Sequence, residues 1–278
     1  MSAGPLSAGP PVALTIAGSD SGGGAGLQAD LRTFTTCGVH GCVAVTAVTV
    51  QNSLGVTAIV EIPPSIVADQ VRAVAIDIGV AAAKTGMLAS AAIIHAVAQV
   101  CDEVGIGLGR VVPLVVDPVA ASMHGDPLLA RDALAALRSE LLPRATLVTP
   151  NLDEVRLLVD IDVGSRAQQH DAARALHALG SQWVLVKGGH LREDPECLDL
   201  LYNGHEFATF TSPRLATPHT HGSGDTLAAA ITSALARDAT VPEAVAYAKH
   251  YIEQAVAHAY PLGAGVGPVS PFWRLLPD

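Results

Sequence analysis

Charged and aromatic residues are scarce in this chain of 278 residues, of which 15% are Asp, Glu, Lys or Arg and 4% are Phe, Trp or Tyr. Basic residues number 16 and acidic residues 26, so the formal net charge is -10. Such a chain lacks the broad basic field that holds a nucleic-acid backbone or an anionic membrane. We therefore expect no nucleic acid and no membrane among its partners, and any anionic ligand must be held by local groups.

Several common site signatures are also missing. The four cysteines form no CxxC pair, so they indicate reduced thiols rather than a zinc site or a disulfide scaffold. His219 and His221 are two positions apart and no HExxH occurs, which argues against a histidine-based metal site. No GxSxG motif marks a hydrolase nucleophile.

No segment is typical of export or of membrane insertion. Residues 1–11 contain neither a basic region nor an apolar run of signal-peptide length, and we expect them to form a flexible leader. The apolar stretch 89–100 is interrupted by polar residues and is shorter than the roughly 20 residues that cross a bilayer. We expect a cytoplasmic protein. No linker or repeat divides residues 12–278, which favours a single domain.

Hydrophobic residues make up 50% of the chain, and short runs rich in Val, Ile and Leu alternate with longer segments of helical periodicity. This alternation is typical of parallel strands joined by crossover helices. It predicts an α/β fold with a mostly parallel sheet covered on both faces. We expect strands at Val12–Ala17, Val43–Val50, Gly79–Lys84, Val111–Val116, Thr146–Thr149 and Trp183–Lys187.

Helical periodicity predicts most of the segments between and after these strands. We expect helices at Gly26–Cys37, Ser65–Asp77, Ser90–Val104, Pro127–Leu141, Asn151–Leu158, Arg166–Leu179, Gly224–Arg237 and Val241–His258. The segments Leu198–Tyr202 and Glu206–Phe210 flank Asn203-Gly204, a dipeptide favoured in tight turns, and predict an antiparallel pair at a sheet edge. Ligands of such sheets bind beyond the carboxyl ends of the strands, so the residues there are the site candidates.

The first strand leads into a glycine-rich loop, residues 17–30, that can bring backbone N–H groups close to a ligand. Residues 24–29 fit the relaxed dinucleotide fingerprint GxGxxG/A, but positions 40–60 lack the acidic residue that would hold a ribose. A dinucleotide-dependent oxidoreductase is therefore a disfavoured alternative. Residues 79–85 approach the P-loop pattern, but Ala83 stands where that motif has glycine. Lys84 is then either an ordinary lysine that snorkels from a strand end or a functional cation.

The strongest local signal is the segment 220–226, THGSGDT, which runs directly into the helical sequence LAAAITSALA. Unpaired N–H groups and the positive end of the helix dipole converge there, so Gly222, Ser223 and Gly224 predict an anion hole. A carboxylate at Asp225 would stand beside a bound phosphate, where it could take a proton from an attacking hydroxyl. The alternative is that Asp225 only supports the first helical turn.

A series of longer blocks spans nearly the whole chain after the leader: LTIAGSDSGGGAGLQADLRTF, AVTAVTVQNSLGV, AAKTGMLAS, VVDPVAASMHGDPLL, LVTPNLDEVRLLV, VLVKGGH, THGSGDTLAAAI and GAGVGPVSPFW. Together and in this order they resemble the hydroxymethylpyrimidine and phosphomethylpyrimidine kinase family of thiamine biosynthesis, within the ribokinase-like superfamily. The resemblance implies a three-layer α/β/α sandwich. It also implies an enzyme that uses ATP to phosphorylate 4-amino-5-hydroxymethyl-2-methylpyrimidine and then its monophosphate.

On the substrate side, the resemblance places the aminopyrimidine beside Asp30 and Gln51, with Met87 packed on the ring. The amide of Gln51 offers a donor and an acceptor in one plane, which match an exocyclic amine beside a ring nitrogen. Gly18 would let the backbone approach the ring closely.

On the nucleotide side, the resemblance places Asn151 and Glu154 near magnesium and phosphate, and Lys187 near the phosphate chain. Asp117, at the end of a strand, is a further candidate for metal-linked water, and the carboxylates are expected to act on Mg²⁺ through water. The implied co-substrate is ATP and the implied cofactor is Mg²⁺.

The chain departs from the family pattern at Asp225, where many thiamine-pathway members carry cysteine and other ribokinase-like enzymes carry aspartate. The substrate therefore stays open between the pyrimidine and a rival, pyridoxal or pyridoxine, which also carries a hydroxymethyl group on a ring. A non-catalytic pyrimidine sensor is a further alternative, which would have little use for an anion hole. Because related kinases are commonly homodimers, the resemblance also implies a homodimer.

Overall fold

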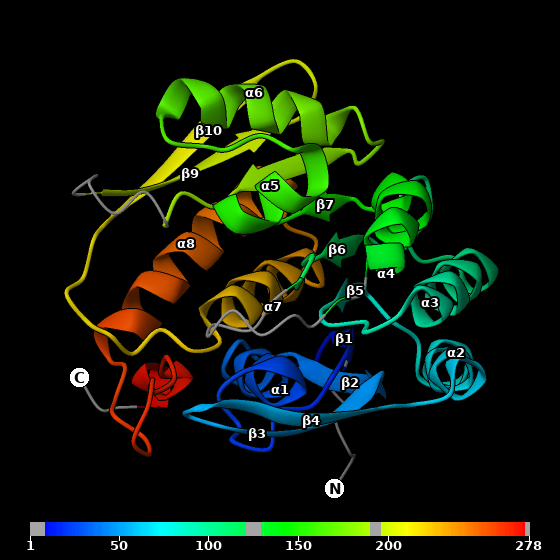
Figure 1. The fold of residues 1–278 in the computed structure, drawn as a ribbon. Helices are drawn as coiled ribbons and strands as arrows, with labels where there is room; N and C mark the ends of the chain where they lie inside the picture. Colours follow the sequence, from blue (N-terminus) through cyan, green and yellow to red (C-terminus); the bar gives the residue numbers. More distant parts are fainter. Residues whose placement is uncertain (1–8, 121–128, 130, 190–195, 276–278) are drawn as a thin grey trace, which may run out of the picture.

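The computed structural model describes residues 9–120, 129, 131–189 and 196–275. The expected leader therefore lies mostly outside the described residues, as does the start of the helix expected at Pro127–Leu141. The described chain forms a central, mostly parallel sheet with helices on both faces, which confirms the predicted α/β class (Figure 1).

The main sheet has eight strands in the order β10-β9-β8-β7-β6-β5-β1-β2, and a separate hairpin is formed by β3 and β4. The strands are β1 (Val12–Ala17), β2 (His40–Val45), β3 (Ala47–Asn52), β4 (Gly55–Glu61), β5 (Ala82–Thr85), β6 (Leu114–Val116), β7 (Leu147–Val148), β8 (Trp183–Val186), β9 (Glu196–Tyr202) and β10 (Phe207–Pro213). Strand β9 is antiparallel to both β8 and β10, so the antiparallel pair expected at a sheet edge is confirmed.

Helices cover the two faces as separate groups. They are α1 (Gly26–Thr36), α2 (Pro64–Ala73), α3 (Ala91–Val104), α4 (Arg131–Ala136), α5 (Leu152–Val159), α6 (Arg166–His177), α7 (Ser223–Leu235) and α8 (Val241–Ala257). Residues of α1, α7 and α8 share one buried cluster, and residues of α2, α3, α5 and α6 share the other. The sheet lies between these two layers.

Alternation along each strand explains why both layers attach to the sheet. Leu14 and Ile16 of β1 belong to one buried cluster, whereas Ala13 belongs to the other. Because successive side chains of a strand point to opposite faces, a strand buried on both faces must be apolar throughout. The continuous apolar runs that predicted the strands have this cause.

One expected strand is wrong. The segment predicted as a single strand, Val43–Val50, divides at Thr46, with its first part in the main sheet and its second part in the β3–β4 hairpin. Thr46 donates its backbone N–H to Ala17 O and its hydroxyl to Met87 O, so it ties the turn to the last residue of β1 and to the loop that follows β5. Strand β4 was not predicted, because its apolar side chains are largely exposed and show no buried alternation.

One helix end and one turn also differ from the expectation. Helix α2 ends at Ala73, and the chain continues to Ile78 as a π-helical segment. Asn203 and Gly204 lie in a four-residue connection between β9 and β10, in which Oδ1 of Asn203 accepts hydrogen bonds from the backbone N–H groups of His205 and Glu206. The side chain therefore shapes this turn.

All four cysteines are free thiols, as predicted. In the part of the chain that the structure describes, no helix has the length and apolar character needed to cross a membrane.

Candidate active site

Helix α7 begins at the segment predicted to form an anion hole. Gly222 caps it with a φ of +74°, and a Cβ on this residue would lie 1.9 Å from Gly24 O, so only glycine fits. The Ser223 N–H donates to Thr220 O at 3.1 Å and is therefore already satisfied. The amides of Gly224 and Asp225, in the first turn, are the ones that a ligand at this helix end would meet.

Asp225 turns its carboxylate toward the start of α1. It accepts a backbone hydrogen bond from Gly26, and its Oδ1 lies 4.0 Å from Nζ of Lys84. Burial raises the pKa of Asp225, and the Lys84 ammonium opposes that rise. A carboxyl that supported only its own helix would need neither contact, so the alternative of a purely structural Asp225 is disfavoured.

Lys84 does not snorkel to solvent. Its side chain is fully buried, and Nζ donates to Oδ1 of Asp30 at 2.7 Å. Burial works against its charge, but the carboxylates of Asp30 and Asp225 raise the pKa of Lys84, so it stays protonated. The sequence left open whether Lys84 is an ordinary snorkelling lysine or a functional cation. Its complete burial shows that it is an internal cation beneath the site.

Asp30 differs from its expected place beside the substrate. The residue has no exposed surface, and its second oxygen, Oδ2, accepts the hydroxyl hydrogen of Thr15 at 2.6 Å. Burial raises the pKa of Asp30 to about 6, against the pull of Lys84. A side chain enclosed in this way cannot touch a ligand, so Asp30 holds Lys84 instead of the ring.

Asp20, which the sequence analysis did not single out, organises the glycine-rich loop. Its carboxylate accepts the backbone N–H groups of Gly22, Gly24 and Ala25 at 2.8–2.9 Å, and Nε2 of His221 is 2.9 Å from its Oδ2. Burial favours the neutral acid, but the hydrogen bonds from His221 and the loop amides hold the pKa of Asp20 below its ordinary value. The loop amides therefore cradle an internal carboxylate and not a dinucleotide phosphate.

The predicted pyrimidine contacts lie at the junction of this loop with the β3–β4 hairpin. Gln51 follows a shift of register in β3, and its backbone exchanges hydrogen bonds with the Ser21 hydroxyl. Its Nε2 is 3.5 Å from Nε2 of His221. A Cβ on Gly18 would lie 2.4 Å from Cε of Met87, so the glycine makes room for the methionine. Gly18 therefore lies against Met87, and Gln51 lies beside Ser21 and His221; the contact of these residues with a pyrimidine stays a prediction.

A second cluster of charges follows β6, β7 and β8. Nζ of Lys187 lies 3.0 Å from Oδ1 of Asp117 and 3.9 Å from Oε2 of Glu154. The carboxylates of Asp117 and Glu154 raise the pKa of Lys187 although burial works against its charge, so this lysine also stays protonated. A Cβ on Gly224 would be 3.4 Å from Nζ of Lys187, which places this cation beside the first turn of α7.

Asn151 and Glu154 form a capping box at the start of α5. Oδ1 of Asn151 accepts the Glu154 N–H at 2.9 Å, and Oε2 of Glu154 accepts the Asn151 N–H at 2.7 Å. Asn151 therefore has a structural task that its predicted role near phosphate did not include. Burial raises the pKa of Glu154 to about 8, against the opposing charge of Lys187.

The residues on this side fit a magnesium ion that is held largely by water and phosphate. Thr149 and Lys187 both donate to Oδ1 of Asp117, whereas Oδ2 faces Gly224, 3.6 Å from where a Cβ would stand. No group of three His, Cys, Asp or Glu among the described residues forms a ready metal cage. Mg²⁺ commonly keeps several waters and takes one or two carboxylates, and its charge would add to that of Lys187 in opposing the rise that burial causes in the pKa of Glu154.

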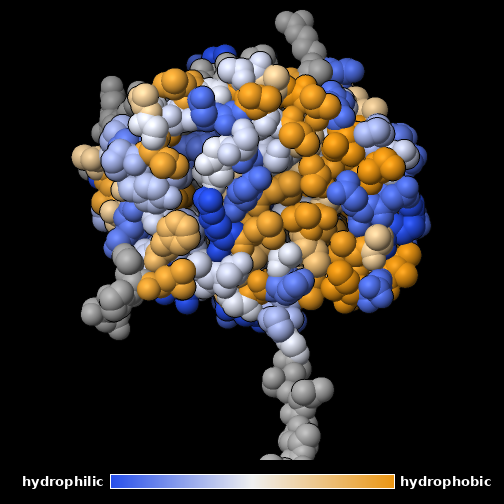
Figure 2. All heavy atoms as spheres, turned by 90° about the horizontal axis from the view of Figure 1, so that it is seen from below, coloured by the Kyte–Doolittle hydropathy of each residue, from blue (hydrophilic) through white to orange (hydrophobic). Residues whose placement is uncertain are grey.

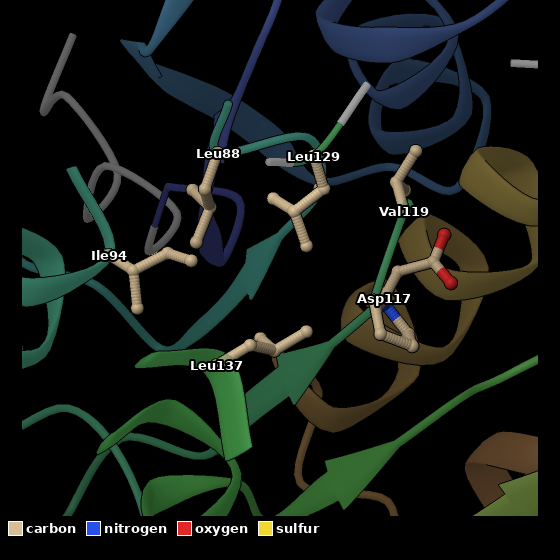
Figure 3. Close-up of a pocket in the computed structure, with 8 residues that line it drawn as sticks. Leu88, Ile94, Asp117, Val119, Leu129 and Leu137 are labelled. Atoms are coloured by element: carbon tan, nitrogen blue, oxygen red, sulfur yellow. The ribbon is translucent and has the colours of Figure 1, made fainter. Parts of the chain in front are cut away.

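A small apolar pocket adjoins Asp117 on the opposite side from α7. Figure 3 shows Leu88, Ile94, Leu129 and Leu137 pointing into it, with Asp117 at its rim. These side chains come from four separate segments of the chain. They provide an apolar wall behind the carboxylate.

The chain is similar to known kinases over most of its length. A family model described as phosphomethylpyrimidine kinase matches residues 20–270. The hydroxymethylpyrimidine/phosphomethylpyrimidine kinase of Mycobacterium tuberculosis is 60% identical over 266 residues, which cover 96% of this chain and 95% of that protein.

Two solved structures share the fold over most of their length. The phosphomethylpyrimidine kinase of Clostridium difficile has a TM-score of 0.77 and 37% identity, and covers 88% of this chain and 99% of its own. The pyridoxal kinase of Staphylococcus aureus in complex with AMP-PCP and pyridoxal has a TM-score of 0.84 and 33% identity, and covers 94% of both chains. With a family model across most of its length and a relative at 60% identity, the chain belongs to the phosphomethylpyrimidine kinase family.

Proposed function

We propose that this protein is an ATP-dependent kinase that phosphorylates hydroxymethylpyrimidine, and then its monophosphate, in thiamine biosynthesis. The observation that carries the proposal is the meeting of Asp225, on the first turn of α7, with the internal cation Lys84 and with Lys187 across Gly224. A base, an anion-binding helix end and a fixed cation are the parts that phosphoryl transfer to an alcohol requires.

In this proposal the pyrimidine lies between Gln51 and Met87, above Gly18. The Gln51 amide pairs with the exocyclic amine and the adjacent ring nitrogen. Met87 is 8% exposed and offers its thioether to one face of the ring. Asp30 takes no part in this contact and acts only by holding Lys84.

The first transfer begins at the hydroxymethyl group. Asp225 accepts its proton, and the oxygen forms a bond to the γ-phosphorus of ATP while the bond from that phosphorus to the β-γ bridging oxygen breaks. The products are the monophosphate, ADP and a proton that Asp225 releases to solvent. A raised pKa suits this task, because such a carboxylate binds a proton more readily than an exposed aspartate.

The charge that develops on the transferred group faces the amides of Gly224 and Asp225 and the ammonium of Lys187. Asp117 and Glu154 would hold Mg²⁺ through water, and when bound the ion neutralises phosphate charge. Two carboxylates that would otherwise repel a triphosphate then assist its binding.

The second transfer has a different requirement. The phosphate of the monophosphate has a second pKa of about 6, so its oxygen is largely ionised at neutral pH. No base is needed for its attack on the γ-phosphorus. Asp225 therefore matters for the alcohol and much less for the monophosphate.

A pyridoxal kinase activity is the second candidate, favoured by the likeness to the solved pyridoxal kinase. The pyridoxal ring also carries a hydroxymethyl group for Asp225 to deprotonate. It lacks the amine that the Gln51 amide would pair with. We propose pyridoxal as at most a side substrate.

We further propose a cytoplasmic homodimer formed by single kinase domains. The β3–β4 hairpin exposes Val48, Val50 and Val60 by 49%, 58% and 64%. Figure 2 views the molecule from the side of this hairpin and shows hydrophobic side chains gathered over that face. Sedimentation of the purified protein tests the proposal, and a monomer at micromolar concentration would contradict it.

The function is tested by a coupled ADP-release assay with hydroxymethylpyrimidine, its monophosphate and pyridoxal, each with MgATP. We expect turnover of both pyrimidines, and a much lower kcat/KM for pyridoxal. Turnover of pyridoxal alone would replace the proposal by its alternative. No turnover of any of the three substrates would contradict both the pyrimidine kinase and the pyridoxal kinase activity.

A further inference from the structure

A buried ion pair joins α8 to β9 outside the residues that the mechanism uses. Nζ of Lys249 lies 2.8 Å from Oδ2 of Asp199, and the two side chains are 9% and 6% exposed. Ions that leave water are costly to a fold unless further hydrogen bonds satisfy them. The remaining bonds of this pair therefore indicate what it holds in place.

Those bonds lead to the loop that follows β8. Oδ1 of Asp199 accepts the backbone N–H of Gly188 at 3.0 Å. Lys249 also donates to Cys197 O at 2.8 Å, which holds its ammonium beside the start of β9. Asp199 thus uses one oxygen for Lys249 and the other for the residue after Lys187.

The backbone around Gly188 has little freedom to move. A Cβ on Gly188 would lie 2.0 Å from Leu198 O, so the loop is packed directly against β9. Nε2 of Gln169 bridges the same two segments, with bonds of 3.0 Å to Val186 O and 3.2 Å to Leu198 O. Within this packing, the acceptor for the Gly188 N–H is the Asp199 carboxylate.

We propose that Asp199, held by Lys249, is a positioning residue for the nucleotide: it fixes the Gly188 amide and thereby keeps the adjacent Lys187 where it meets the phosphates. The proposal rests on the phosphate-binding role of Lys187 in the proposed function. Neither Asp199 nor Lys249 touches a substrate. Their effect should therefore fall on nucleotide binding and leave the pyrimidine side unchanged.

Two matched double variants separate this role from simple support of the fold. D199N/K249M and D199L/K249M both remove the two buried charges, but only the first keeps an oxygen that accepts the Gly188 N–H. Calorimetric titration with ADP and, separately, with hydroxymethylpyrimidine reports on the two sides of the site. We expect D199L/K249M to weaken ADP binding about tenfold, as the loss of a hydrogen bond in the loop predicts. D199N/K249M should stay close to the original protein. The pyrimidine affinity should change less than about twofold in both variants, because the bonds of this pair lead to Gly188 and Cys197 and not to the residues proposed to hold the pyrimidine.

A double-mutant cycle with K187A tests whether the effect passes through Lys187. In the K187A background, the further change D199L/K249M should alter ADP affinity by less than about twofold. A purely structural role would weaken ADP binding equally in both backgrounds. If D199L/K249M does not fold, D199S/K249M takes its place, because the serine oxygen stands where Cγ of Asp199 is and is too far back for Gly188.

Three results would overturn the inference: unchanged ADP affinity in the variant that lacks the acceptor, a parallel loss of ADP and pyrimidine affinity, or an equal loss in the K187A background. Failure of the proposed function is seen separately, as absence of pyrimidine turnover by the unmodified protein. If the unmodified protein turns over the pyrimidines but D199L/K249M weakens ADP binding equally with and without K187A, the inference is wrong and the proposed function stands.

Discussion

The ammonium of Lys84 lies 4.0 Å from Oδ1 of Asp225. The same nitrogen donates to Asp30 at 2.7 Å, so one buried cation serves two carboxylates. Since burial raises the pKa of Asp225 and Lys84 opposes the rise, the lysine determines over which pH range this carboxylate is available as a base. Lys84 and Asp30, 54 positions apart in sequence, therefore influence the pKa of a third residue, Asp225.

Replacing the base should separate the two phosphorylations. We expect D225A to slow phosphorylation of hydroxymethylpyrimidine by roughly 10²- to 10⁴-fold, the usual contribution of a general base. Phosphorylation of the monophosphate should fall by less than about tenfold, because its oxygen is already ionised. Single-turnover rates with each substrate measure both effects, and D225N, which keeps the shape without the basic oxygen, should behave alike. Equal losses for the two substrates would remove the base from the mechanism.

The buried cation should control the pH dependence. Asp225 faces Lys84, Asp117, His221 and Asp30 together with the Gly26 amide, and Lys84 is the strongest influence that lowers its pKa. The variant K84M/D30N leaves no unpaired buried charge. Loss of the Lys84 ammonium, 4.0 Å from Asp225, should outweigh loss of the Asp30 charge, so the pKa of Asp225 should rise. The acid limb of kcat/KM for hydroxymethylpyrimidine should therefore move to higher pH.

The monophosphate provides the control for that variant. Its transfer needs no base, so its profile should keep the same acid limb in the variant as in the unmodified protein. Unchanged profiles for both substrates would show that Lys84 does not govern Asp225.

Asp20 should stabilise the fold in a pH-dependent way. Its pKa is lower in the folded protein than its ordinary value of 3.8, so its contribution is present above that pH and is lost as the pH falls through the folded pKa. We expect D20N to lower the free energy of unfolding by about 1–3 kcal/mol at pH 7, as loss of a buried charged hydrogen-bond acceptor predicts. Urea unfolding at pH 7 and near pH 3 measures the difference, which should shrink at the lower pH. A difference of the same size at both pH values would contradict the assignment.

Gln51 should select the pyrimidine. We expect Q51A to raise the KM for hydroxymethylpyrimidine about tenfold, because the amine and ring nitrogen lose their partners. The KM for ATP should stay unchanged. Q51E keeps the size of the side chain but cannot donate a hydrogen bond, so it should also raise the KM for hydroxymethylpyrimidine. If any pyridoxal turnover is detectable, its KM should respond less, and a larger effect on pyridoxal than on the pyrimidine would reverse the substrate assignment.

Much of the site could be predicted because its parts are local in the chain. The THGSGDT segment runs directly into α7, so a short stretch of sequence carries both the glycine cap and Asp225. Lys187 and Asp117 come directly after short apolar strands, where parallel sheets place their ligands. For these residues the local pattern and the final position agree.

The roles of Asp20 and Asp30 were not predicted from the sequence. Asp20 is the acidic residue among the glycines of the first loop, a signal that could have marked it as the acceptor for the loop amides. Its partner His221 is 201 positions away, and no local pattern joins the two. Asp30 failed as a substrate contact because its place in the helix did not reveal that Lys84 would enclose it.

The sequence by itself determined the α/β class, the edge pair of strands and the glycine-capped start of α7, because periodicity and glycine placement act over a few residues. Only the tertiary structure decided which charges meet. The pairs Lys84–Asp30 and Lys249–Asp199 join separate elements across 54 and 50 positions, and each forms because the packed layers bury the two ions next to one another, away from water. Burial depends on how all the layers pack and not on any single segment. It is burial that pairs these Lys and Asp residues and fixes their positions.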